Sequence, residues 1–334
     1  MKRSTGTKNS MAVRPTDDGL HLEGSILWLD SHLNGELSFL SSAAQILSSK
    51  VPQVIATEET IKILESNKKK PNALICQYNR PFSIGKLKME LLPSGSVLGG
   101  ASLHIETEKG RILYAPHLQT QRVPTVRQMQ LKKAQTLILG AYHPDPNQPL
   151  PNRKREKDRL LNTVKAALLE KTYPIIICQP VAIAQEITKL LTDEGLPVMV
   201  HPSIYKINGI YETYGSKLGE YTKYNPKHKA PKVLLYPLMT GRSPIVRTHI
   251  PDGPLLLVED TMEPTMNVRR NSEITERFFI STNADGRELR EVIAAVAPRE
   301  VFIFGPYAKR YCDELKTTCS KVEPLFPNDQ PTLF

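Results

Sequence analysis

The 334-residue sequence predicts an α/β protein, and three features of its pattern indicate this class. Short apolar segments of strand length, separated by turn residues, dominate the first 140 residues or so. From about residue 150, segments with the pattern of a strand alternate with segments with the pattern of a helix, which predicts βαβ units and a parallel sheet. The end of the chain repeats the order strand, helix, strand.

The first part is expected to be mostly β-structure with helices laid against the sheets. Its strand candidates are SILWLD, LSFLSS, QVIAT, ALICQY, KMELLP, ASLHIE, RILYAP and TLILGAY. One helix interrupts them, from Glu58 to Glu65, with Thr57 as its expected N-cap.

The proline-rich stretch from His143 to Asn152 predicts a linker or domain edge. After it comes an amphipathic helix with Leu160, Leu161, Val164, Ala167 and Leu168 on one stripe. The expected order then is the strand Tyr173–Cys178, the helix Ala182–Thr192, the strand Leu196–His201, a lysine-rich loop at Lys217–Lys232, the strands VLLYPL, LLLVED and FFIST, the helix Arg287–Ala297, the strand VFIFGPY and a helix from Ala308.

Composition limits the class of protein. No run of about 18 apolar residues occurs, and the N-terminal segment lacks the apolar core of a secretory signal, so we expect no membrane span. That segment is polar and is expected to be a flexible tail as far as Gly19. The four cysteines form no CxxC pair, which favours a reducing, cytoplasmic location over a disulfide framework or zinc ribbon.

The formal net charge is +10, and the basic residues come in groups. Such groups suit a polyanion, most plausibly nucleic acid, DNA or RNA. The alternative is that lysine-rich loops only keep the protein soluble. The candidate contacts are Arg153, Lys154, Arg155, Lys157, Tyr221, Lys223, Tyr224, Lys227, Lys229 and Lys232, with the tyrosines either stacking on bases or anchoring a loop.

Several phrases resemble the motifs of one nuclease family. They are Trp28-Leu29-Asp30, the phrase SGSVLGGA at Ser94–Ala101, Tyr114–Leu118, Gly140-Ala141-Tyr142, the phrase STNAD at Ser281–Asp285, and Phe304-Gly305-Pro306. The sequence is similar to the metallo-β-lactamase/β-CASP nucleases, nearest the bacterial DNA-ligase-associated exonucleases, from about residue 24 to 320. The resemblance implies an αββα sandwich formed by residues 20–150 and 275–334, with an inserted β-CASP α/β domain at 151–274.

The resemblance also shows where this sequence departs from the family. The family hydrolyses phosphodiesters with two zinc ions, which imidazole and carboxylate groups must hold. The ligand positions here are Ser42, Ala44, Ile46, Leu47, Ser96, His117 and Gly305, and the further acidic and histidine positions of the β-CASP part are Gly140 and Asn283. Because only His117 among the ligand positions can bind zinc, we expect no metal, no cofactor and no catalytic residue.

Two other readings of the site remain open at this point. The eight histidines have no pair at i, i+2 or i, i+4, but His117, His143 and His201 could still meet in space to hold one metal ion. Ser96 and His117 could form a metal-independent nucleophile and base.

The sequence thus predicts a catalytically inactive relative of these nucleases that acts as a nucleic-acid-binding or scaffolding subunit in DNA repair or RNA processing. By analogy its partner is an active nuclease paralogue, a ligase or a helicase. The alternatives are a hydrolase with a rebuilt site near His117 and a protein–protein adaptor without nucleic-acid binding.

Overall fold

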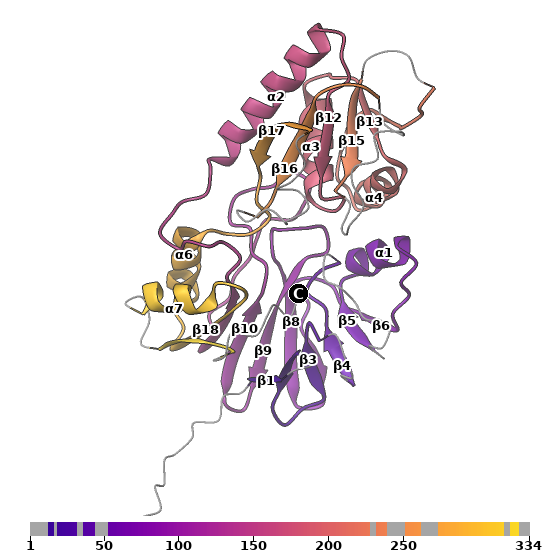
Figure 1. Ribbon diagram of the computed structural model, residues 1–334. Coiled ribbons are helices and arrows are strands. Elements are labelled where there is room, and N and C mark those ends of the chain that lie inside the picture. The colour runs from indigo at the N-terminus through magenta and orange to yellow at the C-terminus, as the bar shows by residue number, and fades with distance from the viewer. Residues whose placement is uncertain are drawn as a thin grey trace, which may run out of the picture.

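The computed structural model describes residues 13–16, 19–31, 36–43, 53–227, 232–238, 251–261, 273–316 and 321–326. Within them lie three sheets and six helices, a mixed α/β architecture (Figure 1). Among these residues no helix is long and apolar enough to cross a membrane.

The first sheet has six strands that lie side by side in chain order. They are β1 (Val13–Thr16), β2 (Gly19–Leu22), β3 (Leu27–Leu29), β4 (Leu37–Phe39), β5 (Val54–Ala56) and β6 (Ala73–Ile75). β1 and β2 pair antiparallel, so the flexible tail expected as far as Gly19 is wrong from Val13 onward. Val13 and Leu22 are both buried in the core, and this burial holds the segment that its polar composition had suggested was loose.

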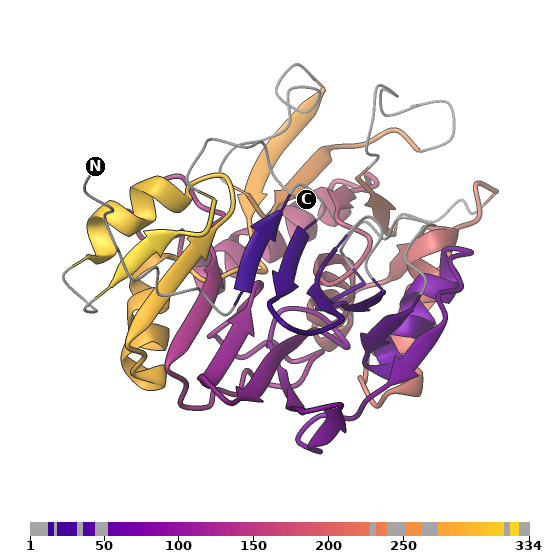
Figure 2. The ribbon, with the colours of Figure 1, turned by 90° about the horizontal axis from the view of Figure 1, so that it is seen from below.

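The second sheet has seven strands and faces the first one (Figure 2). In spatial order they are β19 (Val322–Pro324), β18 (Glu300–Phe304), β11 (Thr136–Gly140), β10 (Gly110–Ala115), β9 (Ala101–Thr107), β8 (Leu87–Pro93) and β7 (Phe82–Ile84). Alternating side chains of both sheets, among them Leu29, Phe39, Leu103 and Ile138, form one core between them.

Helices cover the outer faces of this pair of sheets. α1 (Glu58–Ser66) packs Ile61 and Leu64 on the first sheet, and α6 (Gly286–Val296) and α7 (Ala308–Leu315) lie on the second. The Thr57 hydroxyl accepts from the Thr60 backbone N–H at 3.2 Å, which confirms the expected N-cap. Four layers result, which we call the sandwich.

The third sheet contains six strands, all paired in parallel, as the alternation of strands and helices predicts. Its order is β14 (Tyr221–Lys223), β13 (Val198–Val200), β15 (Val233–Pro237), β12 (Ile175–Cys178), β16 (Leu255–Glu259) and β17 (Ile274–Phe279). Its helices are α2 (Arg153–Leu169), α3 (Ile183–Asp193) and α4 (Pro202–Thr213). α4 and β14 were not expected from the sequence, although Pro202 at the first turn is a helix-start signal.

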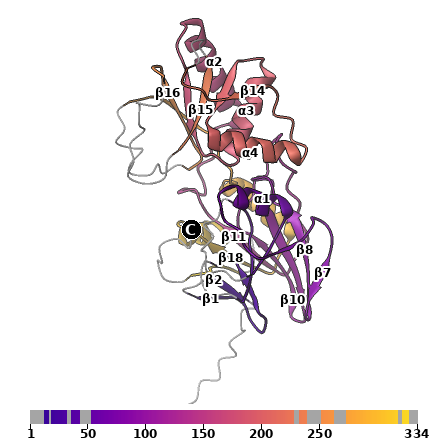
Figure 3. The ribbon, with the colours of Figure 1, turned by 90° about the vertical axis from the view of Figure 1, so that its right-hand side faces the viewer.

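The third sheet is inserted into the sandwich. The chain leaves the sandwich after β11, forms the third sheet, and returns to the sandwich before β18. β11 and β18 are parallel neighbours in the second sheet. α4 lies over α1 (Figure 3), where Leu98, Ile207, Tyr211 and Leu218 form an apolar contact between the third sheet's helices and the sandwich. The carboxyl ends of the third sheet point toward the sandwich (Figure 1).

Candidate functional site

The carboxylate of Asp30 is held inside the sandwich by hydrogen bonds from the protein. Asp30 follows β3 in a left-handed conformation, with φ of 46°, and is 3% exposed. Its carboxylate accepts from the Ser41 backbone N–H at 2.7 Å and from the Tyr114 hydroxyl at 2.9 Å. Hydrogen bonds to a charged group are each worth about 1.5–3 kcal/mol, so Asp30 serves to join β3, β4 and β10.

Aromatic rings fill the space beside Asp30. Tyr114 stacks on Phe304 with 6.0 Å between ring centroids, and Phe39 meets Tyr114 edge-on at 6.2 Å. Tyr142 meets Phe304 edge-on at 6.5 Å and stacks on His117 at 4.6 Å. We call these five residues the aromatic cluster; it joins three of the phrases that carry the resemblance to metal-dependent nucleases.

His117 is held as a neutral ring. Burial lowers the pKa of its imidazole to about 4, a shift that the hydrogen bond with Asn283 only partly opposes. In the neutral form Nδ1–H donates to Asn283 Oδ1 at 3.0 Å, and Nε2 accepts from the Tyr142 hydroxyl at 3.4 Å. Both ring nitrogens therefore face protein groups that neither carry charge nor bind zinc well.

Gly140 and Gly305 leave no room for the side chains that the resemblance implies there. A Cβ on Gly140 would lie 2.3 Å from the Pro116 carbonyl oxygen and 2.4 Å from the Tyr142 ring. Gly305 has φ of +102°, and its Cβ would lie 2.7 Å from the Ala141 carbonyl oxygen. Gly305 thus needs glycine for its backbone conformation as well as for space, and Gly140 needs it for space alone.

The serines at the positions where the resemblance implies metal ligands are buried among neighbouring groups. Ser42 is 2% exposed, and the Ser96 hydroxyl lies 2.8 Å from that of Ser94. The structure pairs Ser96 with Ser94 and His117 with Asn283, which gives the proposed nucleophile and base different partners. Ala44, Ile46 and Leu47 lie outside the described residues.

The histidines that could have met at one metal ion lie in separate surroundings. His143 is 1% exposed, and its Nε2 is 3.1 Å from the Ser281 hydroxyl. His201 caps α4 by accepting from the Ser203 backbone N–H at 3.2 Å. Across the described ranges, no three His, Cys, Asp or Glu side chains gather where they could hold a metal ion. The residues described here therefore do not fit a two-zinc centre.

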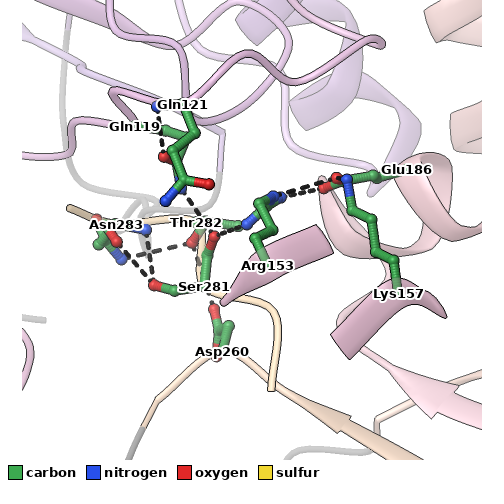
Figure 4. A network of polar contacts seen from close by, with 9 residues as sticks. All are labelled: Gln119, Gln121, Arg153, Lys157, Glu186, Asp260, Ser281, Thr282 and Asn283. Carbon is green, nitrogen blue, oxygen red and sulfur yellow. Dashed lines mark hydrogen bonds and ion pairs between the residues drawn. The ribbon is translucent and has the colours of Figure 1, made fainter. Parts of the chain in front are cut away.

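Two of the expected nucleic-acid contacts, Arg153 and Lys157, belong instead to a buried polar network (Figure 4). Both cations pair with Glu186, and the side-chain exposures are 8% for Arg153, 17% for Lys157 and 4% for Glu186. Arg153 also donates to the Ser281 carbonyl oxygen, which accepts from Gln119 Nε2 at 2.9 Å. The expectation that these two cations contact phosphates is wrong, because the helix start at Asn152 turns them inward onto α3.

The remaining candidates are exposed to different degrees. Lys154, Arg155, Lys223 and Lys227 are exposed, whereas Tyr224 and Lys232 are half-buried. The Tyr221 hydroxyl donates to Glu212 at 2.9 Å, which supports its role as a loop anchor. Lys229 lies outside the described residues.

These candidates form two groups rather than one. Lys223 ends β14 at one edge of the third sheet, and α2, which carries Lys154 and Arg155, packs on β17 at the other. Five strand spacings separate the two edges, roughly 24 Å at about 4.8 Å each.

Sequence reasoning missed the two rings that fill the site, Tyr142 and Phe304. Each lies within two residues of Gly140 or Gly305, where the resemblance implies a functional side chain. A bulky aromatic residue beside such a glycine was the sequence signal that could have predicted a ring in this space.

Comparison with known proteins gives distant relatives. No protein-family model matches the chain. A protein named "Probable DNA ligase" from Opitutus terrae is 21% identical over 304 residues, which cover 89% of this chain and 29% of that protein. The chain thus spans less than a third of that relative's length. A crystal structure of a protein of unknown function from Enterococcus faecalis V583 has the same fold, with a TM-score of 0.62 at 15% identity over 88% of this chain and 79% of that one.

Proposed function

We propose that this chain has the metallo-β-lactamase/β-CASP fold. The sandwich then includes β1 from residue 13 and the segment after β17, and the inserted domain extends from 151 to 279 rather than to 274, because β17 belongs to the third sheet. Two facing sheets with helices outside them support this assignment, as does a parallel sheet inserted between the neighbouring strands β11 and β18.

The protein is a pseudoenzyme. The observation that carries this proposal is the pair Gly140 and Gly305, whose surroundings exclude any side chain without a shift of backbone or ring. Two-metal hydrolysis requires several imidazoles and carboxylates around one cavity, and here aromatic rings occupy the corresponding region. The three fully buried rings, Phe39, Tyr114 and Phe304, stabilise the fold by roughly 1.5–3 kcal/mol each, which replaces the stability that bound metal gives to other folds.

Its role is to bind nucleic acid or to serve as a scaffold for proteins that act on it. The net charge of +10 supports this role, and so does the distant relative whose name is that of a DNA ligase. Lys154 and Arg155 form one candidate contact and Lys223 and Lys227 the other, since all four are exposed.

The relative is more than three times as long as its region of similarity, which covers 29% of it. That protein bears the name of a DNA ligase, which supports a functional link between this chain and a ligase. A ligase is therefore the partner we favour over a helicase or an active nuclease paralogue.

Metal analysis and a nuclease assay test the loss of chemistry. We expect the purified protein to contain less than one zinc per chain and to leave labelled single- and double-stranded DNA and RNA intact when zinc or manganese is added. Two bound zinc ions, or cleavage lost on chelation, would refute the pseudoenzyme proposal.

Salt-dependent binding tests the nucleic-acid role. Each lost phosphate contact lowers the slope of log K against log salt by about 0.9 for duplexes and about 0.7 for single strands. We expect Lys223→Glu/Lys227→Glu to weaken binding and reduce this slope. The control Lys86→Glu/Lys88→Glu changes the charge equally, at exposed positions near the β7–β8 turn, and should have little effect. Binding that is absent at low salt would favour the adaptor instead.

A further inference from the structure

A pocket of about 160 Å³ lies where α4 meets the sandwich, separate from the aromatic cluster. Its walls come from the first turn of α1, from the glycine-containing phrase Leu98-Gly99-Gly100, from Pro124–Arg127 and from Tyr214–Ser216 after α4. A cavity of about 150 Å³ holds one benzene molecule, so this pocket accommodates one ring-sized group and not a duplex. Figure 3 shows the junction of α1 and α4 beside which it lies.

The floor of the pocket is fixed by packing. Leu98 belongs to the apolar cluster beneath α4, and its backbone N–H donates to the Tyr211 hydroxyl at 3.2 Å. Gly99 has φ of +78°, and a Cβ there would lie 2.5 Å from the Thr60 backbone nitrogen, so this wall depends on a bare backbone. The Tyr78 hydroxyl donates to the Gly100 carbonyl oxygen at 2.8 Å, which holds the tyrosine ring in the wall.

Thr125 supplies an unsatisfied polar group at this pocket. It is 2% exposed, and its hydroxyl has no hydrogen-bond partner among the described residues, although its carbonyl oxygen accepts from the Ser216 hydroxyl at 2.7 Å. The hydroxyl oxygen itself is shielded in the present side-chain conformation. Leaving it unpaired is unfavourable, so a rotation of the Thr125 side chain toward a polar group in the pocket would supply the missing hydrogen bond.

Charges of both signs line the same pocket. Arg127 is exposed and its guanidinium lies 5.5 Å from the centre of the Tyr78 ring. In the part of the chain that the structure describes, no carboxylate forms an ion pair with it. Glu59, in the first turn of α1, is the acidic group of the lining. A ligand that suits both carries an anionic group for Arg127 and N–H or O–H donors for Glu59.

We infer that this pocket binds one nucleotide of a single-stranded nucleic acid, with the base or sugar inside it and the adjoining phosphate at Arg127. A nucleotide combines a planar ring of the required size, hydrogen-bonding edges for Thr125 and Glu59, and a phosphate. This inference rests on the proposed nucleic-acid role and assigns to it a site that none of the basic groups named from the sequence contains.

Fluorescence anisotropy with a short labelled single-stranded DNA tests the assignment, alongside the same strand made with abasic residues. We expect Arg127→Gln to weaken binding of the intact strand about tenfold and to lower the salt slope by about 0.7. Thr125→Val should weaken it about three- to tenfold, the worth of one hydrogen bond, and Thr125→Ser should retain near-normal affinity. Arg122→Gln is the matched control, since Arg122 is exposed on the same segment outside the pocket.

The abasic strand separates recognition of the base or sugar from general charge. If the base enters the pocket, the abasic strand binds more weakly and Thr125→Val does not weaken it further. Intact binding that is indifferent to Arg127→Gln, or reduced equally by Arg122→Gln, overturns the pocket assignment and leaves the nucleic-acid role standing. Absence of any binding by the unaltered protein overturns the nucleic-acid role itself. Arg127 is exposed, so its variant is informative even where Thr125→Val fails to fold.

Discussion

Acidification provides a direct test of the neutral ring at His117. The pKa of a histidine in an unfolded chain is near 6.5, whereas burial lowers the pKa of His117 to about 4 in the folded protein. Between these values the unfolded chain binds more protons than the folded one. Stability from this group is therefore fully present above about pH 6.5 and is lost as the pH falls toward 4.

The expected loss follows from the two pKa values. Between pH 7.5 and pH 4.5, the titration of His117 lowers the free energy of unfolding by roughly 2.5 kcal/mol. Urea unfolding at both pH values gives this drop in the free energy of unfolding for the native protein and for His117→Gln. We expect the drop to be smaller in the variant by about this amount. Burial also lowers the pKa of His104, His143 and His201, but these contribute alike to both proteins.

Parallel loss of stability in the two proteins would contradict a half-buried, neutral ring at His117, and so would an NMR titration that places the pKa of His117 near 6.5.

Two further predictions concern stability. Glu186→Gln leaves Arg153 and Lys157 without their carboxylate and should lower the free energy of unfolding by about 3–5 kcal/mol in urea titrations. The control Glu194→Gln breaks an exposed ion pair with Lys165 and should cost less than about 1 kcal/mol. Similar losses in both variants would show that the buried network adds nothing. Gly305→Ala should lower the melting temperature, because its Cβ meets the Ala141 carbonyl oxygen at a φ of +102°, at a cost of about 1–3 kcal/mol. Gly209→Ala, on the exposed face of α4 with no atom nearby, should raise stability by up to about 1 kcal/mol; a matching loss in both variants would contradict the argument.

The regular elements were predictable where one local signal dominates. The run Ile175–Cys178 is apolar on both faces because helices and side chains cover both sides of the third sheet, and Thr57 is a standard N-cap. β1 and α4 were missed for a different reason: tertiary packing holds them, through Val13 in the sandwich core and Ile207 against the sandwich, and neither contact has a local pattern.

Only part of the candidate site could be predicted from the sequence. Gly140 and Gly305 stand where the resemblance implies functional side chains, and the sequence shows their identities directly. Which rings lie beside them depends on contacts in space, because Tyr142 and Phe304 are far apart in sequence. Likewise, Arg153 and Lys154 are neighbours in a basic run, and only the direction in which α2 starts decides that one pairs with Glu186 and the other faces solvent.

The insertion between β11 and β18 also sets an order for folding. Residues Thr136–Gly140 pair in parallel with Glu300–Phe304, and about 160 residues separate the two strands along the chain. During synthesis the apolar edge of β11 must therefore wait, unpaired, until the whole third sheet has been made. Pairing of β18 with β11 closes the longest loop between neighbouring strands of the second sheet and is expected to be a slow step. If the third sheet folds early, it brings β11 and β18 close together. The edge of β11 is then exposed for a shorter time, and it has less opportunity to pair with a strand of another molecule.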